Sequence, residues 1–299
     1  MLWKRMTIRA KLYYGIKFFL HRNRRVLRSA QSLRAYLILG PLRKHLVWYY
    51  QNCANNERLK LEASPVLTDV NVEHIINRLE NLGYSHIGIL SQEHVSRILD
   101  YSDVNKRVSH WNPHYDCESI RSIAYAPNIV RIARRYLGAE PILWLTRLRW
   151  SIPLSDGMAD MQPPIHKEPI EYDPNRFHYD AHDCKSLTFF VYLTDIDDLD
   201  SGAHVVIEGT HKSKTFNDIM QITIDDELAY KKYGEKITVI LGKKGTVFAE
   251  ESSAYHKIAD CRRRRLILMI CYVLGRKIPP EIPMTSAWPL GDTRHQLRQ

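Results

Sequence analysis

The sequence contains few of the residues that mark secreted or membrane-spanning chains. Only 5 of its 299 residues are cysteines. None of them forms a CxxC pair, and an odd number argues against a closed disulfide framework, so we expect a reducing compartment. No run of about 18 apolar residues occurs, which predicts no transmembrane helix. The opening segment MLWKRMTIRA has neither the apolar stretch nor the cleavage site of a secretory signal, so we expect none.

Acidic residues are missing from the first 56 positions, and Glu57 is the first of the chain's 33. The same positions hold 12 of the 43 lysines and arginines, and the other 31 nearly balance the acidic residues. The net charge of +10 therefore comes from this segment. Bulky aromatic residues such as Trp3, Tyr36 and Trp48 are interleaved with its cations.

Three explanations fit this basic segment. A basic amphipathic helix with aromatic residues suits an anionic membrane surface, where apolar side chains enter the headgroup region and cations face phosphates. The segment could also be a helical lead that packs on the main domain with a solvated basic face. Nucleic acid binding through phosphate contacts and stacking is the least favoured. The absence of acid favours the membrane, so we expect a cytoplasmic protein that is peripheral on the inner face of a membrane.

The periodicity of apolar residues divides the chain into four parts. These are a basic amphipathic N-terminal arm at 1–56, a helical lead at 57–140, a core at 141–280 and a C-terminal tail at 281–299. The arm reads as two helices broken near Gly40 and Pro41. In the lead, helical patterns cover 72–82, 91–99 and 120–137, and a short strand covers 84–90. Pro127 interrupts the third helical region, and Gly138 ends it.

After Pro141 the pattern changes to that of strands. Runs rich in Val, Ile, Phe, Tyr and Thr lie at 142–150, 187–193, 203–207, 237–241, 246–249 and 265–273. Turn residues separate these runs, and helices do not alternate with them as a parallel sheet requires. We therefore predict a mainly β fold with flanking helices, of the α+β class, whose antiparallel sheets form a sandwich or jelly roll.

Two side chains with metal-binding chemistry lie in the segment RFHYD. His178 and Asp180 are two residues apart, so on a strand both point to one face. His256, in a late strand region, offers a third ligand. Two histidines and one carboxylate on one face of an octahedron leave three positions open, which is the arrangement of non-haem Fe(II) oxygenases. These three residues are the predicted catalytic metal ligands.

Arg265 follows His256 by nine residues and opens the last strand run. A buried arginine can hold a carboxylate through two parallel hydrogen bonds. A 2-oxo acid whose keto acid end binds the metal would need such a partner at its other end. On a strand Arg263 would share the face of Arg265, and it is the alternative.

Two long segments resemble the phytanoyl-CoA dioxygenase family. They are HYDAHDCKSLTFFVYLTDIDDLDSGAHVVIEGTHKSK at 178–214 and AYHKIADCRRRRLILMICYV at 254–273. Weaker similarity at 74–95 and 129–143 extends the resemblance to about residues 70–275. It covers neither the basic arm nor the tail.

Members of this family are Fe(II)- and 2-oxoglutarate-dependent oxygenases on a double-stranded β-helix, which is a jelly roll of the cupin type. The resemblance implies that His178, Asp180 and His256 bind iron and that Arg265 binds 2-oxoglutarate. It also implies Fe(II) as the metal, with 2-oxoglutarate and dioxygen as cosubstrates.

Other polar residues are less favoured for the site. His114, Tyr115 and Asp116 form a second HYD motif, but it precedes a helical region and reads as a polar loop. The lesser candidates are His182 beside the ligands, His166 at the entrance, His204 and His211 in structural roles, and Thr188 or Tyr192 as a hydroxyl partner of 2-oxoglutarate.

The resemblance implies hydroxylation of an unactivated C–H bond in a small or lipid-linked substrate. Halogenating relatives lack the carboxylate ligand, which is present here as Asp180. The basic arm points to a membrane-borne substrate, and hydroxylation of the octulosonic acid sugar of lipopolysaccharide is a precedent. Two alternatives stay open: a non-catalytic binding module on the same fold, and a zinc-dependent hydrolase that uses His178, Asp180, His182 and His256.

Overall fold

The computed structural model describes residues 24–54, 56–105, 108–153, 175–212 and 214–275. The first 23 residues of the predicted arm, His166 and the predicted tail lie outside these residues. The helices are α2 (Arg24–Leu39), α3 (Arg43–Asn52), α4 (Val72–Leu82), α5 (Gln92–Asn105), α6 (Glu118–Ala124), α7 (Pro127–Leu137), α8 (Phe216–Met220) and α9 (Asp226–Tyr233). The strands are β1 (Tyr84–Ile89), β2 (Ser109–Trp111), β3 (Ile142–Ser151), β4 (Phe177–His178), β5 (Ser186–Tyr192), β6 (His204–Ile207), β7 (Thr223–Ile224), β8 (Ile237–Ile240), β9 (Thr246–Glu250), β10 (His256–Ile258) and β11 (Arg265–Val273).

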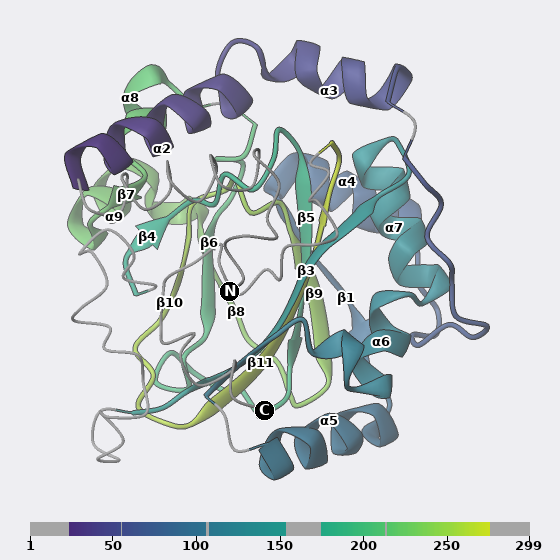
Figure 1. Ribbon diagram of the computed structural model, residues 1–299. Coiled ribbons are helices and arrows are strands. Elements are labelled where there is room, and N and C mark those ends of the chain that lie inside the picture. Colours follow the sequence, from purple (N-terminus) through teal and green to yellow (C-terminus); the bar gives the residue numbers. More distant parts are fainter. Residues whose placement is uncertain (1–23, 55, 106–107, 154–174, 213, 276–299) are drawn as a thin grey trace, which may run out of the picture.

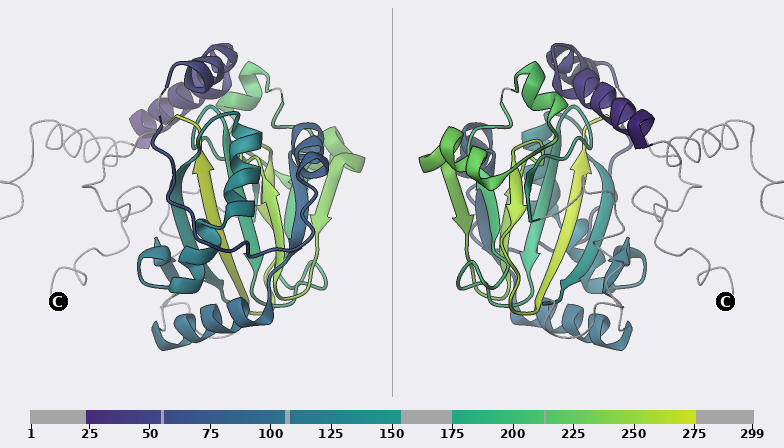
Figure 2. Two further views of the ribbon diagram at one scale, coloured as in Figure 1. Left: turned by 90° about the vertical axis from the view of Figure 1, so that its right-hand side faces the viewer. Right: turned by 90° about the vertical axis from the view of Figure 1, so that its left-hand side faces the viewer.

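The strands form two antiparallel sheets. The six-stranded sheet has the order β1-β9-β5-β11-β3-β2, and the five-stranded sheet has the order β7-β4-β10-β6-β8. The two sheets face each other, and helices α6 and α7 cover the outer side of the larger one (Figures 1 and 2). This architecture confirms the predicted mainly β fold with flanking helices.

The central strands are apolar on both faces because both faces are covered. All seven residues of β5 are buried. One face contributes Phe189 to the core under the helices, and the other contributes Phe190 to the core between the sheets. A strand that is covered on both sides carries a continuous apolar run.

Two helix predictions are confirmed. The predicted helix 72–82 is confirmed as α4, which begins after Asn71 and ends at Gly83 with a positive φ of 88°. The Asn71 side chain accepts a hydrogen bond from the backbone of His74. The predicted helical region 120–137 with an interruption at Pro127 is confirmed, because the structure has α6 and then a new helix α7 that starts at Pro127. Proline has no N–H to donate within a helix, and it is well suited to the first helical position.

The described part of the basic arm packs on the rest of the protein. Helices α2 and α3 are separated near Gly40, as predicted, and lie across one end of the sandwich (Figure 1). Ala35 and Leu39 of α2 are buried in the same core cluster as Phe177 and Tyr179. None of the helices among the described residues combines the length and apolarity that a membrane crossing requires.

Candidate metal centre

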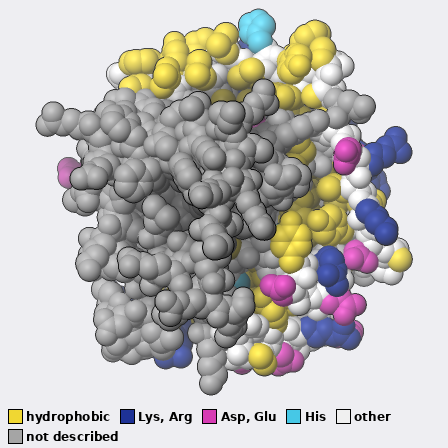
Figure 3. Space-filling model, viewed as in Figure 1, with side chains coloured by type: hydrophobic (Ala, Val, Ile, Leu, Met, Phe, Trp, Pro, Cys, Tyr) yellow, Lys and Arg dark blue, Asp and Glu magenta, His cyan; other side chains and the backbone are white. Residues whose placement is uncertain are grey.

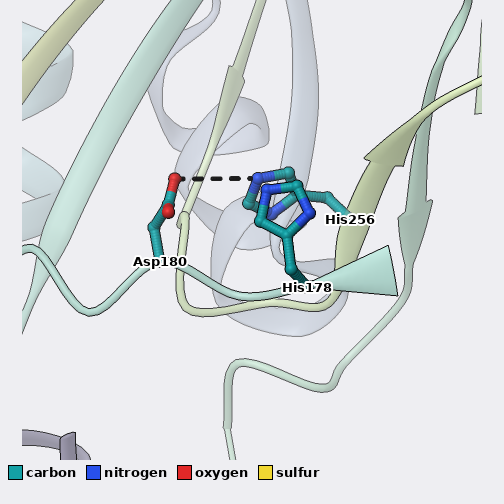
Figure 4. A group of neighbouring side chains, drawn as sticks. All are labelled: His178, Asp180 and His256. Atoms are coloured by element: carbon teal, nitrogen blue, oxygen red, sulfur yellow. Dashed lines mark ion pairs between the residues drawn. The ribbon is translucent and has the colours of Figure 1, made fainter. Parts of the chain in front are cut away.

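Three predicted ligands come together in the smaller sheet. His178 ends β4, Asp180 follows it in the next loop, and His256 begins β10. The antiparallel register of β4 and β10 pairs His178 directly with His256. One ligand atom from each of the three residues lies within 4.8 Å of the other two (Figure 4). The side chains of Asp180 and His256, which are 76 residues apart in sequence, therefore lie close together.

Backbone carbonyls orient the two imidazoles. His178 Nδ1 lies 2.9 Å from the carbonyl oxygen of Arg176, and His256 Nδ1 lies 3.1 Å from that of Ala254. An Nδ1–H that donates to a carbonyl fixes the tautomer and leaves Nε2 with a lone pair for a metal. His256 Nε2 lies 3.8 Å from Asp180 Oδ2 (Figure 4). The ring orientation is therefore that of metal-binding histidines.

The Asp180 carboxylate is held in its charged form. Its burial would raise its pKa, but His182, His256 and His178 together keep that pKa well below its usual value. His182 Nε2 lies 3.3 Å from Asp180 Oδ2, and the Asp180 backbone N–H donates to Ser252 O at 2.8 Å. His182 thus lies next to a predicted ligand.

A second buried acid, which sequence reasoning missed, stands behind His256. Glu250 ends β9 and is fully buried. Its Oε1 lies 3.0 Å from His256 Nδ1, and its other oxygen contacts His204 Nε2. Burial would raise the pKa of Glu250, but the two histidines lower it to about 2. The signal in the sequence was an acidic residue that ends an otherwise apolar strand.

The electrostatics of the cluster favour a cation. Burial would lower the pKa of His256, but Glu250 and Asp180 raise it to about 9. Burial and the neighbouring His256 lower the pKa of His178 to about 4. Two carboxylates thus share one buried site with imidazoles, and the donor set of nitrogen and oxygen atoms fits a divalent transition metal.

Arg265 has the properties of an anion-binding residue. It is 1% exposed, and its Nη1 donates to Gly202 O at 2.6 Å. Its Nε has no hydrogen-bond partner, and within the described ranges no carboxylate forms an ion pair with it. Burying an unpaired guanidinium is costly unless an anion joins it. The carboxylate of a 2-oxo acid fits this requirement.

The remaining sequence candidates lie in other settings. Arg263, the alternative to Arg265, is half-exposed and pairs with Asp198. His114 of the second HYD motif contacts Thr146 Oγ1 at 2.7 Å, outside the metal cluster. Thr188 pairs with the Ser252 hydroxyl, and Tyr192 donates to Ile240 O.

Comparison with known proteins gives structural matches only. No protein-family model matches the chain, and a search of curated proteins finds no match. The epimerase SnoN, solved with Fe3+, alpha ketoglutarate and nogalamycin RO, is 18% identical, with 74% of this chain and 91% of that chain covered and a TM-score of 0.50. EctD from S. alaskensis, solved with 2-oxoglutarate and 5-hydroxyectoine, is 15% identical, with 74% and 84% covered and a TM-score of 0.48.

The likeness to SnoN concerns the fold, since the two sequences are so different. It agrees with the two-sheet architecture and with the family resemblance of the sequence. The chain therefore has a double-stranded β-helix fold like that of SnoN.

Proposed function

We propose that this protein is an Fe(II)- and 2-oxoglutarate-dependent dioxygenase that hydroxylates an unactivated C–H bond. The observation that carries the proposal is the meeting of His178, Asp180 and His256 in one buried cluster of a double-stranded β-helix. Arg265, a buried cation with an unused donor, supports the 2-oxoglutarate part of the proposal.

Each residue of the site has a defined task in this proposal. His178, Asp180 and His256 would hold the iron on one face and leave the opposite positions for other ligands. Bound iron, 2-oxoglutarate and dioxygen would supply the oxidising chemistry, as cofactors do in such enzymes. Arg265 would bind the distal carboxylate of 2-oxoglutarate with its guanidinium.

Asp180 decides between hydroxylation and halogenation. A halide needs the coordination position that a carboxylate ligand would fill, and the Asp180 carboxylate is charged and faces His256 Nε2. The proposed reaction is accordingly transfer of a hydroxyl group.

The test is an anaerobic titration of the metal-free protein with Fe(II) and 2-oxoglutarate. We expect a weak visible charge-transfer absorption, and we expect oxygen uptake that depends on 2-oxoglutarate once air is admitted. His178→Ala should lose both signals. His114→Ala changes the equally buried histidine of the second HYD motif and should keep both.

The alternatives give other results in the same experiment. A zinc-dependent hydrolase would be purified with zinc and show no absorption with Fe(II) and 2-oxoglutarate. A non-catalytic binding module would show no oxygen uptake with or without a substrate. Either result would refute the dioxygenase proposal.

For the substrate we propose a small or lipid-linked molecule met by a cytoplasmic enzyme at the inner face of a membrane. The concentration of positive charge in residues 1–56 supports this location. A membrane-borne sugar such as the octulosonic acid of lipopolysaccharide belongs to this class. A mass-spectrometric screen of lipid extracts should find a product heavier by one oxygen atom, and a screen that finds such products only among water-soluble compounds would exclude the lipid-linked class.

A further inference from the structure

Large apolar side chains lie exposed on α2, on α3 and on the turn between them. Their exposed fractions are 59% for Leu33, 45% for Leu37, 51% for Leu42, 61% for Trp48 and 51% for Tyr49. Leu33 and Leu37 are one helical turn apart, so they share a face of α2. Figure 3 shows hydrophobic side chains gathered along the upper edge of the molecule, where α2 and α3 lie in Figure 1. We call these five residues the apolar stripe.

The opposite side of α2 is fixed to the protein. Ala35 and Leu39 are buried in the core cluster between the sheets, and Tyr36 packs edge-on against Phe216 of α8. Because this side of α2 is packed against the protein, Leu33 and Leu37 on the other side face outward.

The segment that carries the apolar stripe is basic. Arg34 and Lys44 are exposed on the same two helices. The 23 residues that precede α2 contain six lysines and arginines and no acid. Exposed apolar and aromatic side chains in a basic segment match the headgroup boundary of a bilayer that contains anionic lipids.

We propose that the apolar stripe of α2 and α3 docks the protein on an anionic lipid bilayer. Trp48 and Tyr49 would lie at the headgroup level, as amphipathic rings do at membrane interfaces, and the leucines would enter the acyl boundary. A second copy of the chain fits less well, because two such faces would bring like charges together.

The docking helix is connected to the metal centre. Arg34 of α2 donates from Nη2 to the backbone carbonyl of His182 at 2.8 Å. His182 in turn lies 3.3 Å from the predicted ligand Asp180 and packs against Trp144 at 4.6 Å between ring centroids. Docking through α2 would thus bring the metal centre close to the bilayer surface. This placement favours a membrane-borne amphiphile as the substrate. The inference about the substrate rests on the proposed function, and the docking itself does not.

The docking is tested by flotation of the full-length, metal-free protein with lipid vesicles. We expect binding to vesicles of phosphatidylglycerol and phosphatidylcholine and little binding to phosphatidylcholine alone. Raising the salt from about 0.05 to about 0.5 M should weaken it, since the Debye length falls severalfold over that range. No difference between the two vesicle types would overturn the proposal.

Substitutions in the apolar stripe test the location. The double variant Leu37→Gln/Trp48→Gln should bind anionic vesicles roughly tenfold less, since two interfacial side chains are lost. The matched control is Val104→Gln, which removes an 81% exposed side chain from α5 at the opposite end of the protein (Figure 1). Equal binding of the double variant and the control would place the contact elsewhere in the chain and overturn the proposal.

Fluorescence quenching by brominated acyl chains gives a direct readout at Trp48. When the wild-type protein binds vesicles with brominated acyl chains, the fluorescence of Trp48 should be quenched. The Trp48→Phe variant lacks this residue and should show less quenching. Unquenched Trp48 in the bound protein would show that other residues make the contact. If instead vesicles do not bind and the double variant turns a dimer into a monomer, the stripe is an interface between copies.

The docking and the proposed function can fail separately. Flotation needs neither iron nor 2-oxoglutarate, and the charge-transfer absorption needs no vesicles. Binding without the absorption would leave the docking in place and refute the oxygenase. The charge-transfer absorption without vesicle binding would support the oxygenase and refute the docking.

Discussion

At the scale of single residues, the centre depends on a buried acid that contacts two histidines. The Glu250 carboxylate reaches His256 with one oxygen and His204 with the other, and the two imidazole rings are stacked at 5.4 Å between centroids. Carboxylates behind metal-binding histidines fix the ring and raise its basicity, and their loss commonly weakens metal binding by about 10- to 100-fold.

Glu250→Gln should therefore weaken Fe(II) binding by about 10- to 100-fold, measured by anaerobic titration of the charge-transfer absorption. The matched control is Glu251→Gln. Glu251 is equally buried, but its carboxylate accepts hydrogen bonds from the hydroxyls of Tyr136 and Ser253 and not from a predicted metal ligand. The control should lower the free energy of unfolding by about 1–3 kcal/mol and keep the iron affinity. Equal iron affinities in the two variants would contradict the assigned role of Glu250.

We expect the buried Arg265 to lower the stability of the metal-free protein. Replacing it with methionine removes a buried cation that, among the described residues, has one hydrogen bond, to Gly202. We expect Arg265→Met to leave the metal-free protein at least as stable as the wild type, since an unpaired buried charge is unfavourable. The thermal shift produced by 2-oxoglutarate with Fe(II) should disappear. Arg263→Met, on the surface, should retain this shift, and its loss in both variants would refute the assignment.

At the scale of elements, two very short strands carry the ligands. β4 has two residues and β10 has three, and their pairing depends on the strands on either side of them. So few residues have little intrinsic tendency to form a strand, so hydrogen bonds to the neighbouring strands must stabilise β4 and β10. At the junction of α4 and β1, His211 lies close to Gly83, and the Gly83 carbonyl accepts a hydrogen bond from the Glu251 N–H.

Gly83→Ala should destabilise the protein at this junction. Gly83 has a φ of 88°, and an added Cβ would lie 2.7 Å from His211 Nδ1. The left-handed conformation alone costs roughly 1–2 kcal/mol for an L-residue, and the contact with His211 adds to it. Gly209→Ala is the control, because Gly209 has a similar φ of 75° and an added Cβ would meet Asn81 O at an ordinary 3.7 Å. Urea unfolding should show a larger loss for Gly83→Ala, and equal losses would refute the contact.

At the scale of the whole molecule, buried neutral histidines make stability depend on pH. Burial, helped by Arg121, lowers the pKa of His114 to about 4, and burial lowers that of His211 to about 4. An unfolded histidine has a pKa of about 6.5. Between these values the unfolded chain binds more protons than the folded protein, so the free energy of unfolding falls as the pH drops below 6.5.

Urea unfolding of the metal-free protein at pH 7 and pH 5 tests this effect. Each of the two histidines should contribute a loss of up to about 2 kcal/mol at pH 5. His114→Gln cannot take up this proton and should lose less stability over the same interval. An unchanged pH dependence in His114→Gln would contradict the prediction.

Whether a feature could be predicted from the sequence depends on how far apart in the chain the residues that form it lie. The helix 72–82 could be predicted because its cap residues Asn71 and Gly83 are its own neighbours. The separation of α6 from α7 could be predicted from Pro127, because its missing N–H is a local property. The short strands β4 and β10 could not be assigned bounds, since long-range pairing holds them.

The sequence by itself determined three properties of this protein: runs of strand-forming residues, the order of His178, Asp180 and His256, and a cationic N-terminal segment. These properties depend on residue type and spacing, which folding does not change. The tertiary structure alone decided that Glu250 stands behind His256, that Arg265 is buried while Arg263 is exposed, and that α2 lies against His182. The physical reason is that burial and contact come from strand register and packing between residues far apart in the chain.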